Sequence, residues 1–221
     1  MKKLFLTLAF LIISHAASAS SCPNLYPNNF QLSGSSLELC NSFFVTRFDT
    51  VHNVPLFSSE LLNPSQPSVE RSNDFHPDTR LDKNVRAENS DYETTGYDKG
   101  HLVPAEDAST PQEMHDTFLL SNMTPQEPRL NRIAWRMLEE TVHKQVTASG
   151  RATIIITGAI YGKGVVHYIG YHQIQVPVAY YKIVYLDKNI ECFYAINDNT
   201  APRVQQVAIS DLQQYVPFTI Q

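Results

Sequence analysis

Two stretches of this sequence contain side chains that could activate a water molecule and hold a metal ion. The first, Gly96 to Asp107, has the sequence GYDKGHLVPAED and places His101 directly after Gly100. A histidine with an ordinary pKa of about 6.5 can accept a proton from water at neutral pH, and a preceding glycine permits a sharp turn or a close backbone approach. Considered alone, such a histidine is more often structural than catalytic.

The second stretch, Ser121 to Glu140, has the sequence SNMTPQEPRLNRIAWRMLEE and offers the amide of Asn131 and the carboxylate of Glu139. On an α-helix these two residues are separated by about 80° of rotation and about 12 Å of rise. Direct binding of one Mg²⁺ ion by both residues is geometrically awkward, since its ligands lie at about 2.1 Å. We therefore expect Asn131 to bind the ion and Glu139 to hold a water molecule bound to it. Together with His101, this predicts a hydrolytic site with one hydrated metal ion.

Other conspicuous side chains favour ordinary structural roles. None of the eight histidines belongs to a His-Glu-x-x-His pattern, so the sequence does not favour a zinc site. Trp135 is expected in the core, where it fixes the helix. The nearby arginines are expected on the solvated surface rather than on phosphate, and the strand tyrosines are expected to alternate between core and surface. These residues are Arg129, Arg132 and Arg136, and Tyr180, Tyr181 and Tyr185.

The segment that carries Asn131 and Glu139 is the clearest helix in the sequence. Residues 131 to 149 have apolar positions at near-helical spacing, and Gly150 follows as a stop signal. Upstream, Pro111 to His115 is expected to form a short helix, and TFLLSN from Thr117 a short strand. The apolar positions of the long helix are Ile133, Trp135, Met137, Leu138, Val142 and Val146.

Runs of β-branched and aromatic residues predict a substantial sheet. Phe43 to Phe57 alternates around a turn signal at His52-Asn53, which is typical of a β-hairpin. Asn63 to Asn89 contains Pro64, Pro67 and Pro77 and predicts a long surface loop, and such loops are often functional. The expected fold class is α+β with a largely antiparallel sheet. Its later strands are expected in TIIITGAIYG, IGYHQIQVP, AYYKIVYL and IECFYAI.

The first 19 residues are expected to be a secretory signal peptide. Two lysines precede an apolar run there, and small residues up to Ala19 form a cleavage site. A membrane anchor is the alternative, but the run falls short of the roughly 20 residues that cross a bilayer. A second alternative is a lipoprotein acylated at Cys22, but residues 19–21 before this cysteine lack the large aliphatic residue that usually begins such a cleavage site. Residues 20–221 are then a single domain in the periplasm or outside the cell, since 221 residues suit one well-cored domain.

An oxidising compartment makes pairing of the three cysteines relevant. A bond between Cys22 and Cys40 would close a short loop and stabilise the fold by about 3 kcal/mol on the chain-entropy model. Cys192 then remains, and its strand-like neighbours favour a buried small hydrophobe over a reactive thiol. Other pairings stay open at this stage.

The formal net charge of −5 counts modestly against a tight nucleic-acid binder, because such proteins are usually basic. Loss of Lys2 and Lys3 with the signal peptide makes the mature chain more acidic still. An acidic enzyme can act on phosphodiesters if its positive charge is local and a metal cation adds to it.

Three blocks of the sequence carry a family resemblance. YDKGHLVPAED, TFLLSNMTPQ and LNRIAWRMLEE resemble the DNA/RNA non-specific endonucleases, which have a ββα-metal (His-Me finger) core. The likeness extends from about Phe43 to about Ile196 and keeps the order and internal spacing of the blocks. It implies a magnesium-dependent endonuclease, with Mn²⁺ as the alternative ion, that acts on DNA and RNA with little sequence selectivity. It also implies products with 5′-phosphate and 3′-hydroxyl ends.

The resemblance assigns roles to particular residues. The Asp-Arg-Gly-His motif of the family falls on residues 98–101, which makes His101 the implied general base. The metal-binding asparagine falls on Asn131, and the glutamate that contacts the hydrated metal falls on Glu139. An arginine that stabilises the transition state corresponds best to Arg71 in RSNDFHPD, with Arg80 and Arg86 as rivals.

Lys99 departs from the family pattern, which has arginine at this place. Lysine keeps the charge but cannot make the planar two-pronged contact of a guanidinium with phosphate. We expect lower activity or altered substrate preference, without loss of catalysis. Asp98 is expected either to orient His101 or to cap a turn.

Two rival functions remain open from the sequence. One is a catalytically impaired nucleic-acid-binding protein of the same fold, and the other is a metal phosphodiesterase acting on small nucleotides. The presence of a base, a metal ligand and a water-holding carboxylate at compatible positions favours the nuclease. The sequence does not indicate the oligomeric state.

Overall fold

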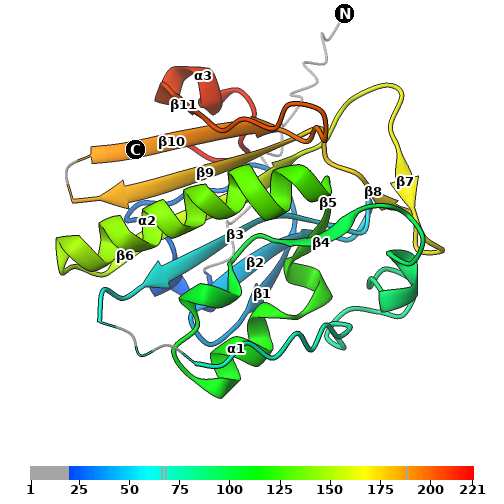
Figure 1. Cartoon of the computed structure of the whole chain (residues 1–221), viewed down its shortest axis with the longest axis horizontal. Coiled ribbons are helices and arrows are strands. Elements are labelled where there is room, and N and C mark those ends of the chain that lie inside the picture. The colour runs from blue at the N-terminus through cyan, green and yellow to red at the C-terminus, as the bar shows by residue number, and fades with distance from the viewer. Residues whose placement is uncertain (1–19, 66, 68, 188) are drawn as a thin grey trace, which may run out of the picture.

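An antiparallel seven-stranded sheet forms the centre of the molecule in the computed structural model, which describes residues 20–65, 67, 69–187 and 189–221 (Figure 1). The expected signal peptide lies outside the described residues. No helix in these described ranges is long and apolar enough to cross a membrane. In spatial order the strands are β1 (Leu37–Cys40), β2 (Phe44–Asp49), β3 (Val54–Leu62), β6 (Thr153–Ile160), β9 (Ala179–Leu186), β10 (Asn189–Ile196) and β11 (Gln205–Val207).

Both faces of this sheet are covered, and the side-chain alternation of the strands divides the core into two layers. Helix α2 (Arg136–Ser149) covers one face, where Ile155 and Tyr180 are buried. Segments near both ends of the chain, including α3 (Ile209–Gln213), cover the other face, where Ile156 and Tyr181 are buried. Successive residues of a strand point to opposite faces. The expected alternation of the tyrosines between core and surface is therefore wrong, because neither face of β9 is open to solvent.

The predicted hairpin is confirmed as β2 and β3, which pair in antiparallel register across a turn containing His52 and Asn53. The later strand predictions are also confirmed, except that IGYHQIQVP forms only the small two-stranded unit of β7 (Tyr168–Ile169) and β8 (Ile174–Gln175). The described residues between β3 and the 3₁₀ turn Asn89–Asp91 form a loop without named helices or strands.

A second pair of strands, β4 (Asp98–His101) and β5 (Met123–Gln126), leads directly into the helical segment that ends in α2. The chain between these strands contains a 3₁₀ turn at Ala105–Asp107, then α1 (Pro111–Thr117), then a 3₁₀ turn at Leu120–Asn122. The strand expected from Thr117 is therefore wrong. A short apolar run does not distinguish a strand from a buried turn, and Phe118 and Leu120 are buried here within turns.

The helix that follows β5 begins with a π-helical segment, Leu130–Trp135, before α2 continues to Ser149. Gly150 ends it with a left-handed φ of 66°, as predicted. The residues of this helix that face the core are Leu130, Trp135, Leu138, Val142 and Val146. The first two are five residues apart, which is the spacing of a π turn. The sequence placed Ile133 and Met137 in the apolar stripe, but they are 50% and 59% exposed, because the helix turns a different side toward the core.

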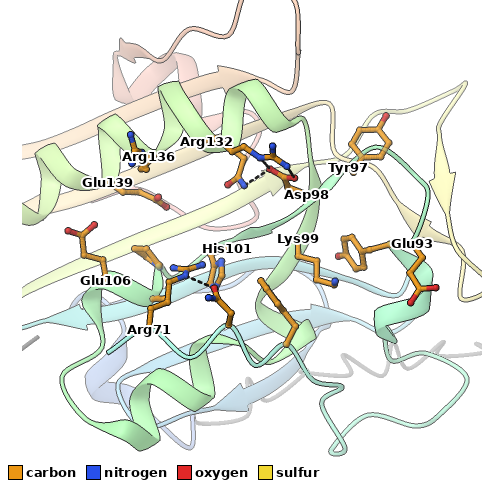
Figure 2. A pocket seen from close by; sticks show the side chains of 16 residues that line it. Arg71, Glu93, Tyr97, Asp98, Lys99, His101, Glu106, Arg132, Arg136 and Glu139 are labelled. Atoms are coloured by element: carbon orange, nitrogen blue, oxygen red, sulfur yellow. Dashed lines mark hydrogen bonds and ion pairs between the residues drawn. The ribbon is translucent and has the colours of Figure 1, made fainter. Parts of the chain in front are cut away.

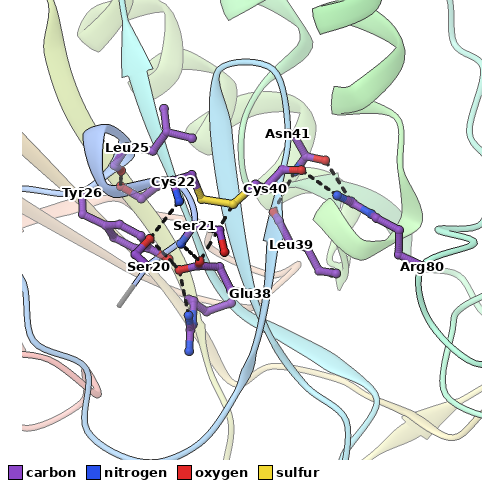
Figure 3. The surroundings of a disulfide bond; sticks show 12 residues. Ser20, Ser21, Cys22, Leu25, Tyr26, Glu38, Leu39, Cys40, Asn41 and Arg80 are labelled. Carbon is purple, nitrogen blue, oxygen red and sulfur yellow. Dashed lines mark hydrogen bonds and ion pairs between the residues drawn. A yellow bond between two sulfur atoms is a disulfide. The ribbon is translucent and has the colours of Figure 1, made fainter. Parts of the chain in front are cut away.

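A disulfide bond joins Cys22 to Cys40 and ties the first described residues to β1 (Figure 3). Beside it, Glu38 accepts hydrogen bonds from the Ser20 hydroxyl and from Tyr26, both at 2.9 Å. Cys192 is buried with a free thiol, as predicted. The N-terminal segment is thus fixed on the face of the sheet opposite α2.

Candidate active site

A cleft of about 820 Å³ lies between β4, the start of the long helix and the loop that follows β3 (Figure 2). Its lining includes all five residues that the sequence predicted for the site. They are His101, Arg71, Lys99, Asn131 and Glu139. In Figure 2, Arg71 and His101 lie on one side of the cleft and Glu139 projects from the helix on the other.

His101 is held in an apolar setting at the end of β4. Its ring lies 5.7 Å from the Phe75 ring and 5.0 Å from the Phe118 ring, measured between centroids. Burial, and then the positive charge of Arg71, lower the pKa of His101 from 6.5 to about 3. Its Nε2 is shielded from solvent and has no hydrogen-bond partner among the described residues. The imidazole is therefore neutral at physiological pH, and one of its two ring nitrogens carries a lone pair that can accept a proton.

Gly100 allows β4 to lie close to β5. A Cβ atom built at this position would lie 2.3 Å from Oε1 of Gln126 and 2.6 Å from its Cβ, distances at which the neighbouring side chain must move. Gln126 is itself fully buried in β5. A glycine is therefore needed at this position of the DKGH motif, because the Gln126 side chain packs against the backbone of Gly100 next to His101. The sequence suggested a close approach of this kind.

Asp98 has a different role from the two that were expected. It accepts hydrogen bonds from Nδ2 of Asn131 at 2.9 Å and from Nε and Nη2 of Arg132 at 2.8 and 2.6 Å. Residues three apart on a strand point to opposite faces, so Asp98 faces the helix while His101 faces Phe75. Asp98 therefore neither orients His101 nor caps a turn, and instead fixes the amide of Asn131.

The oxygen atoms of Asn131 and Glu139 fit the needs of a hydrated hard cation. Because Nδ2 of Asn131 donates to Asp98, its Oδ1 is left as a ligand atom. Oε1 of Glu139 is shielded from solvent and has no hydrogen-bond partner among the described residues. Oxygen ligands supplemented by water are what Mg²⁺ prefers. The π turn between the two residues rotates less per residue than an α-helix, which reduces the angular offset expected from ideal geometry.

The carboxyl group of Glu139 lies near buried ionisable residues that the sequence reasoning missed. Burial raises the pKa of Glu139 to about 7, while Lys182 opposes the shift and Asp107 adds to it. Lys182 is 1% exposed in β9 and donates to Oγ1 of Thr157 at 2.6 Å. Glu60 is fully buried in β3. A lysine inside the apolar run AYYKIVYL was the available signal, since lysines are almost never fully buried without a partner.

Among the three arginine candidates, only Arg71 lines the cleft. Its guanidinium lies over the Phe118 ring at 5.1 Å, and its Nε donates to Asn73 at 2.8 Å. Arg80 is paired with Asp78, and Arg86 with Glu88, away from the cleft lining.

Lys99 lies on the same side of β4 as His101. Its Nζ lies 5.0 Å from the Phe75 ring and 5.5 Å from the Tyr92 ring, so it extends along aromatic surface. Such cation–π contacts hold a lysine in place while its charge stays available to a ligand.

Acidic and basic side chains balance one another along the cleft. Arg132 and Arg136 of the helix line it, and Arg132 is engaged by Asp98. The local positive charge expected for a phosphodiester site is therefore not supplied by the side chains alone. The basic lining residues are Arg71, Lys99, Arg132 and Arg136, and the acidic ones are Glu93, Asp98, Glu106 and Glu139.

The ββα arrangement of β4, β5 and α2 defines an α+β fold of the ββα-metal class, as predicted. The sequence profile described as DNA/RNA non-specific endonuclease matches residues 22–219. The chain therefore belongs to the DNA/RNA non-specific endonuclease family, and the resemblance found in its sequence blocks is confirmed.

Relatives with known names and structures agree with this assignment. Human mitochondrial endonuclease G is 36% identical over 157 residues, which are 65% of this chain and 52% of that protein. Mitochondrial nuclease 1 of Schizosaccharomyces pombe is 31% identical over 167 residues, which are 68% of this chain and 52% of that protein. The chain spans about half the length of the curated relatives it matches. A crystal structure of the EndoG/EndoGI complex superposes with a TM-score of 0.76 and 25% identity, covering 93% of each chain.

Proposed function

We propose that this chain is a metal-dependent endonuclease that hydrolyses phosphodiester bonds of DNA and RNA with little sequence selectivity. One observation carries the proposal: a neutral histidine lines the same cleft as the Asn131 amide and the Glu139 carboxyl group, whose Oε1 is shielded and has no hydrogen-bond partner among the described residues. Family membership supports the substrate class. The compared relatives are themselves named as nucleases, which agrees with it.

In the proposed mechanism, His101 is the general base. The neutral imidazole removes a proton from a water molecule, whose oxygen then forms a bond to phosphorus. The bond from phosphorus to the 3′ oxygen breaks, and this oxygen takes a proton from a second water molecule, which leaves a 5′-phosphate and a 3′-hydroxyl end. Phe75 and Phe118 exclude bulk water from the ring and keep it in the uncharged form that this step requires.

Asn131 and Glu139 would hold one hydrated Mg²⁺ ion, with Mn²⁺ as the alternative. Asp98 accepts a hydrogen bond from Nδ2 of Asn131, which leaves the amide oxygen to bind the ion, and Glu139 would accept a hydrogen bond from a water molecule of its hydration shell. When bound, such an ion offsets negative charge on the phosphate and on the leaving oxygen. In a cleft whose side-chain charges balance, it would also supply the net positive charge that attracts a phosphodiester backbone.

Arg71 and Lys99 would stabilise the charge that develops on the phosphate. Both line the cleft on the side of His101, and both are held over aromatic rings. Preorganised cations of this kind act most strongly where water is excluded.

We place the mature protein in the periplasm or outside the cell, as a single domain of residues 20–221. The lysine-led apolar segment before Ala19 supports export, and a Cys22–Cys40 disulfide is compatible with an oxidising compartment. The compared relatives are named as mitochondrial proteins, so location is a separate question from activity. Mass spectrometry of the exported protein tests it, and a mature N-terminus at Ser20 is expected.

The activity is tested by incubating the purified protein with supercoiled plasmid and with RNA, with Mg²⁺, with Mn²⁺ or with EDTA. We expect nicking and then linearisation of the plasmid, degradation of RNA, and complete loss of both in EDTA. The Asn131→Ala variant should lose activity at low Mg²⁺ concentration and regain part of it at high concentration. Tight binding of nucleic acid without cleavage would favour the impaired homologue. Cleavage of dinucleotides alone would favour a small-nucleotide phosphodiesterase.

A further inference from the structure

A cluster of two histidines and an aspartate lies outside the cleft, between α1 and the loop that follows β3. Each of Asp74, His76 and His115 offers one ligand atom, and these three atoms lie within 4.8 Å of one another. The imidazole rings of His76 and His115 are tilted by 31° to one another, with centroids 4.1 Å apart. None of the three residues lines the active-site cleft.

The backbone brings these residues together across a long stretch of sequence. His76 and Leu119 form a parallel bridge in which His76 N donates to Phe118 O at 3.2 Å and Leu120 N donates to His76 O at 2.9 Å. In Figure 1 the loop after β3 runs past α1 accordingly. The cluster was invisible as a sequence motif because His76 and His115 are contributed by separate segments.

The hydrogen bonding of His76 prepares one of its nitrogens for a metal. Its Nδ1 lies 2.6 Å from the backbone oxygen of Asp74, an arrangement in which Nδ1–H donates to the carbonyl. Its Nε2 then carries the lone pair, and this atom is shielded from solvent without a partner among the described residues. Metal-binding histidines usually donate their other ring nitrogen to a carbonyl or carboxylate in this way. A shielded, unpartnered nitrogen costs free energy that a ligand would recover.

We propose that Asp74, His76 and His115 bind a divalent transition-metal ion of the zinc class. Two imidazoles and one carboxylate suit zinc, copper and nickel, whereas Mg²⁺ prefers an all-oxygen environment. Ligand atoms around tetrahedral zinc lie about 3.3 Å apart, given bonds of about 2.0 to 2.1 Å. Rotation of the exposed His115 and Asp74 side chains closes the difference, and solvent can supply the fourth ligand.

The ion would link α1 to the loop after β3, which also carries Arg71. Phe75 lies between Asp74 and His76 in sequence, and Phe118 lies three residues after His115. The two phenyl rings have centroids 4.8 Å apart, and both contact the His101 ring. Arg71 lies over the Phe118 ring. Occupancy of the site would therefore stabilise the aromatic wall around the general base without contributing a ligand to the reaction.

The test is a calorimetric titration of the tag-free protein with Zn²⁺ in the presence of excess Mg²⁺. We expect one zinc ion to bind, and His115→Gln to weaken its affinity at least tenfold. His52→Gln is the matched control, because His52 is also about half exposed, at 54% against 53%, and contacts an aspartate at 2.6 Å. This control should bind zinc with the same affinity as the wild-type protein. Asn131→Ala should also retain zinc binding, which separates the cluster from the cleft.

Two further measurements remain informative if a variant folds poorly. Zinc should raise the thermal midpoint of the unchanged protein but not of His115→Gln or Asp74→Asn. Bound Cu²⁺ should show hyperfine coupling to two imidazole nitrogens in its electron paramagnetic resonance spectrum, and to one in His115→Gln. Equal zinc affinity in the unchanged protein and His115→Gln would overturn the proposal, as would loss of zinc binding in Asn131→Ala.

Discussion

The two faces of the central sheet bury different chemistry. The face away from α2 is closed by aliphatic and aromatic contacts, among them Phe57 packed edge-on against Phe218 with centroids 5.0 Å apart. The face toward α2 buries Glu60 and Lys182 below Glu139. Burying a charge costs free energy unless it is paired, and active sites concentrate shifted pKa values. The comparison indicates that the face away from α2 stabilises the fold, whereas the face toward α2 is less stabilising because it holds the buried ionisable groups of the site.

The largest expected effect tests the reactive face. His101→Ala should lower kcat by about 10² to 10⁴-fold, which is the usual contribution of a general base. Thermal unfolding should change little, because the imidazole makes few polar contacts. Plasmid nicking under single-turnover conditions measures the rate, and circular dichroism melting measures stability. A variant with unchanged kcat would remove His101 from the mechanism.

The next effect tests the apolar face. Phe57→Ala should reduce the free energy of unfolding by about 3 to 5 kcal/mol, because a fully buried ring leaves a cavity. Rate per folded molecule should stay the same, since Phe57 packs on the face opposite the cleft. Urea unfolding gives the stability, and rates are corrected for the folded fraction. A direct loss of kcat in fully folded protein would show that the two faces are coupled.

The pH dependence of Mg²⁺ binding tests the role of Glu139 on the face toward α2. Because the pKa of Glu139 is raised to about 7, its carboxylate is progressively protonated as pH falls below 7. Mg²⁺ affinity should therefore fall by up to about tenfold per pH unit below 7 and level off above it. His101, with its pKa lowered to about 3, does not contribute in this range.

Calorimetric titrations at pH 6, 7 and 8 measure this dependence. Glu139→Gln is the control, since it cannot ionise and should bind Mg²⁺ more weakly with little change across these pH values. The same slope in Glu139→Gln and in the unchanged protein would assign the titration to another group.

The smallest effect concerns Lys99. Lys99→Arg should raise kcat/KM on DNA by a few-fold, because a guanidinium contacts phosphate with two parallel hydrogen bonds. Lys99→Gln provides the matched loss of charge and should lower kcat/KM. Initial rates on one duplex substrate at fixed ionic strength compare the three proteins. Identical rates would place Lys99 outside the substrate contact.

Much of the fold followed from local patterns in the sequence. The β2–β3 hairpin, β6, β9 and β10 all show strand composition between clear turn signals, and these signals need no tertiary information. The Cys22–Cys40 bond was the pairing that the strand-like context of Cys192 favoured, although the sequence left other pairings open. The gathering of Arg71, His101 and Asn131 in one cleft came from the spacing of family blocks, not from periodicity.

The remaining features depend on contacts between distant segments. The partner of Asp98 is the helix start, which no local pattern reveals. The π turn, visible only as a five-residue step from Leu130 to Trp135, changed which helix positions are buried. The pairing of His76 with α1 depends on a parallel bridge between segments far apart in the chain.

The π segment gives this helix one residue more than an α-helix of the same path would need. Removing Ala134 would allow the wide turn to relax into ordinary α-helix and would keep the Leu138 side of α2 in the core. Leu130 and Trp135 would then be four positions apart, a spacing that an α-helix also places on one face, so neither end of the helix would have to rotate. Asn131 would stay on the side of Glu139, and the helix would absorb the loss of a residue next to the site.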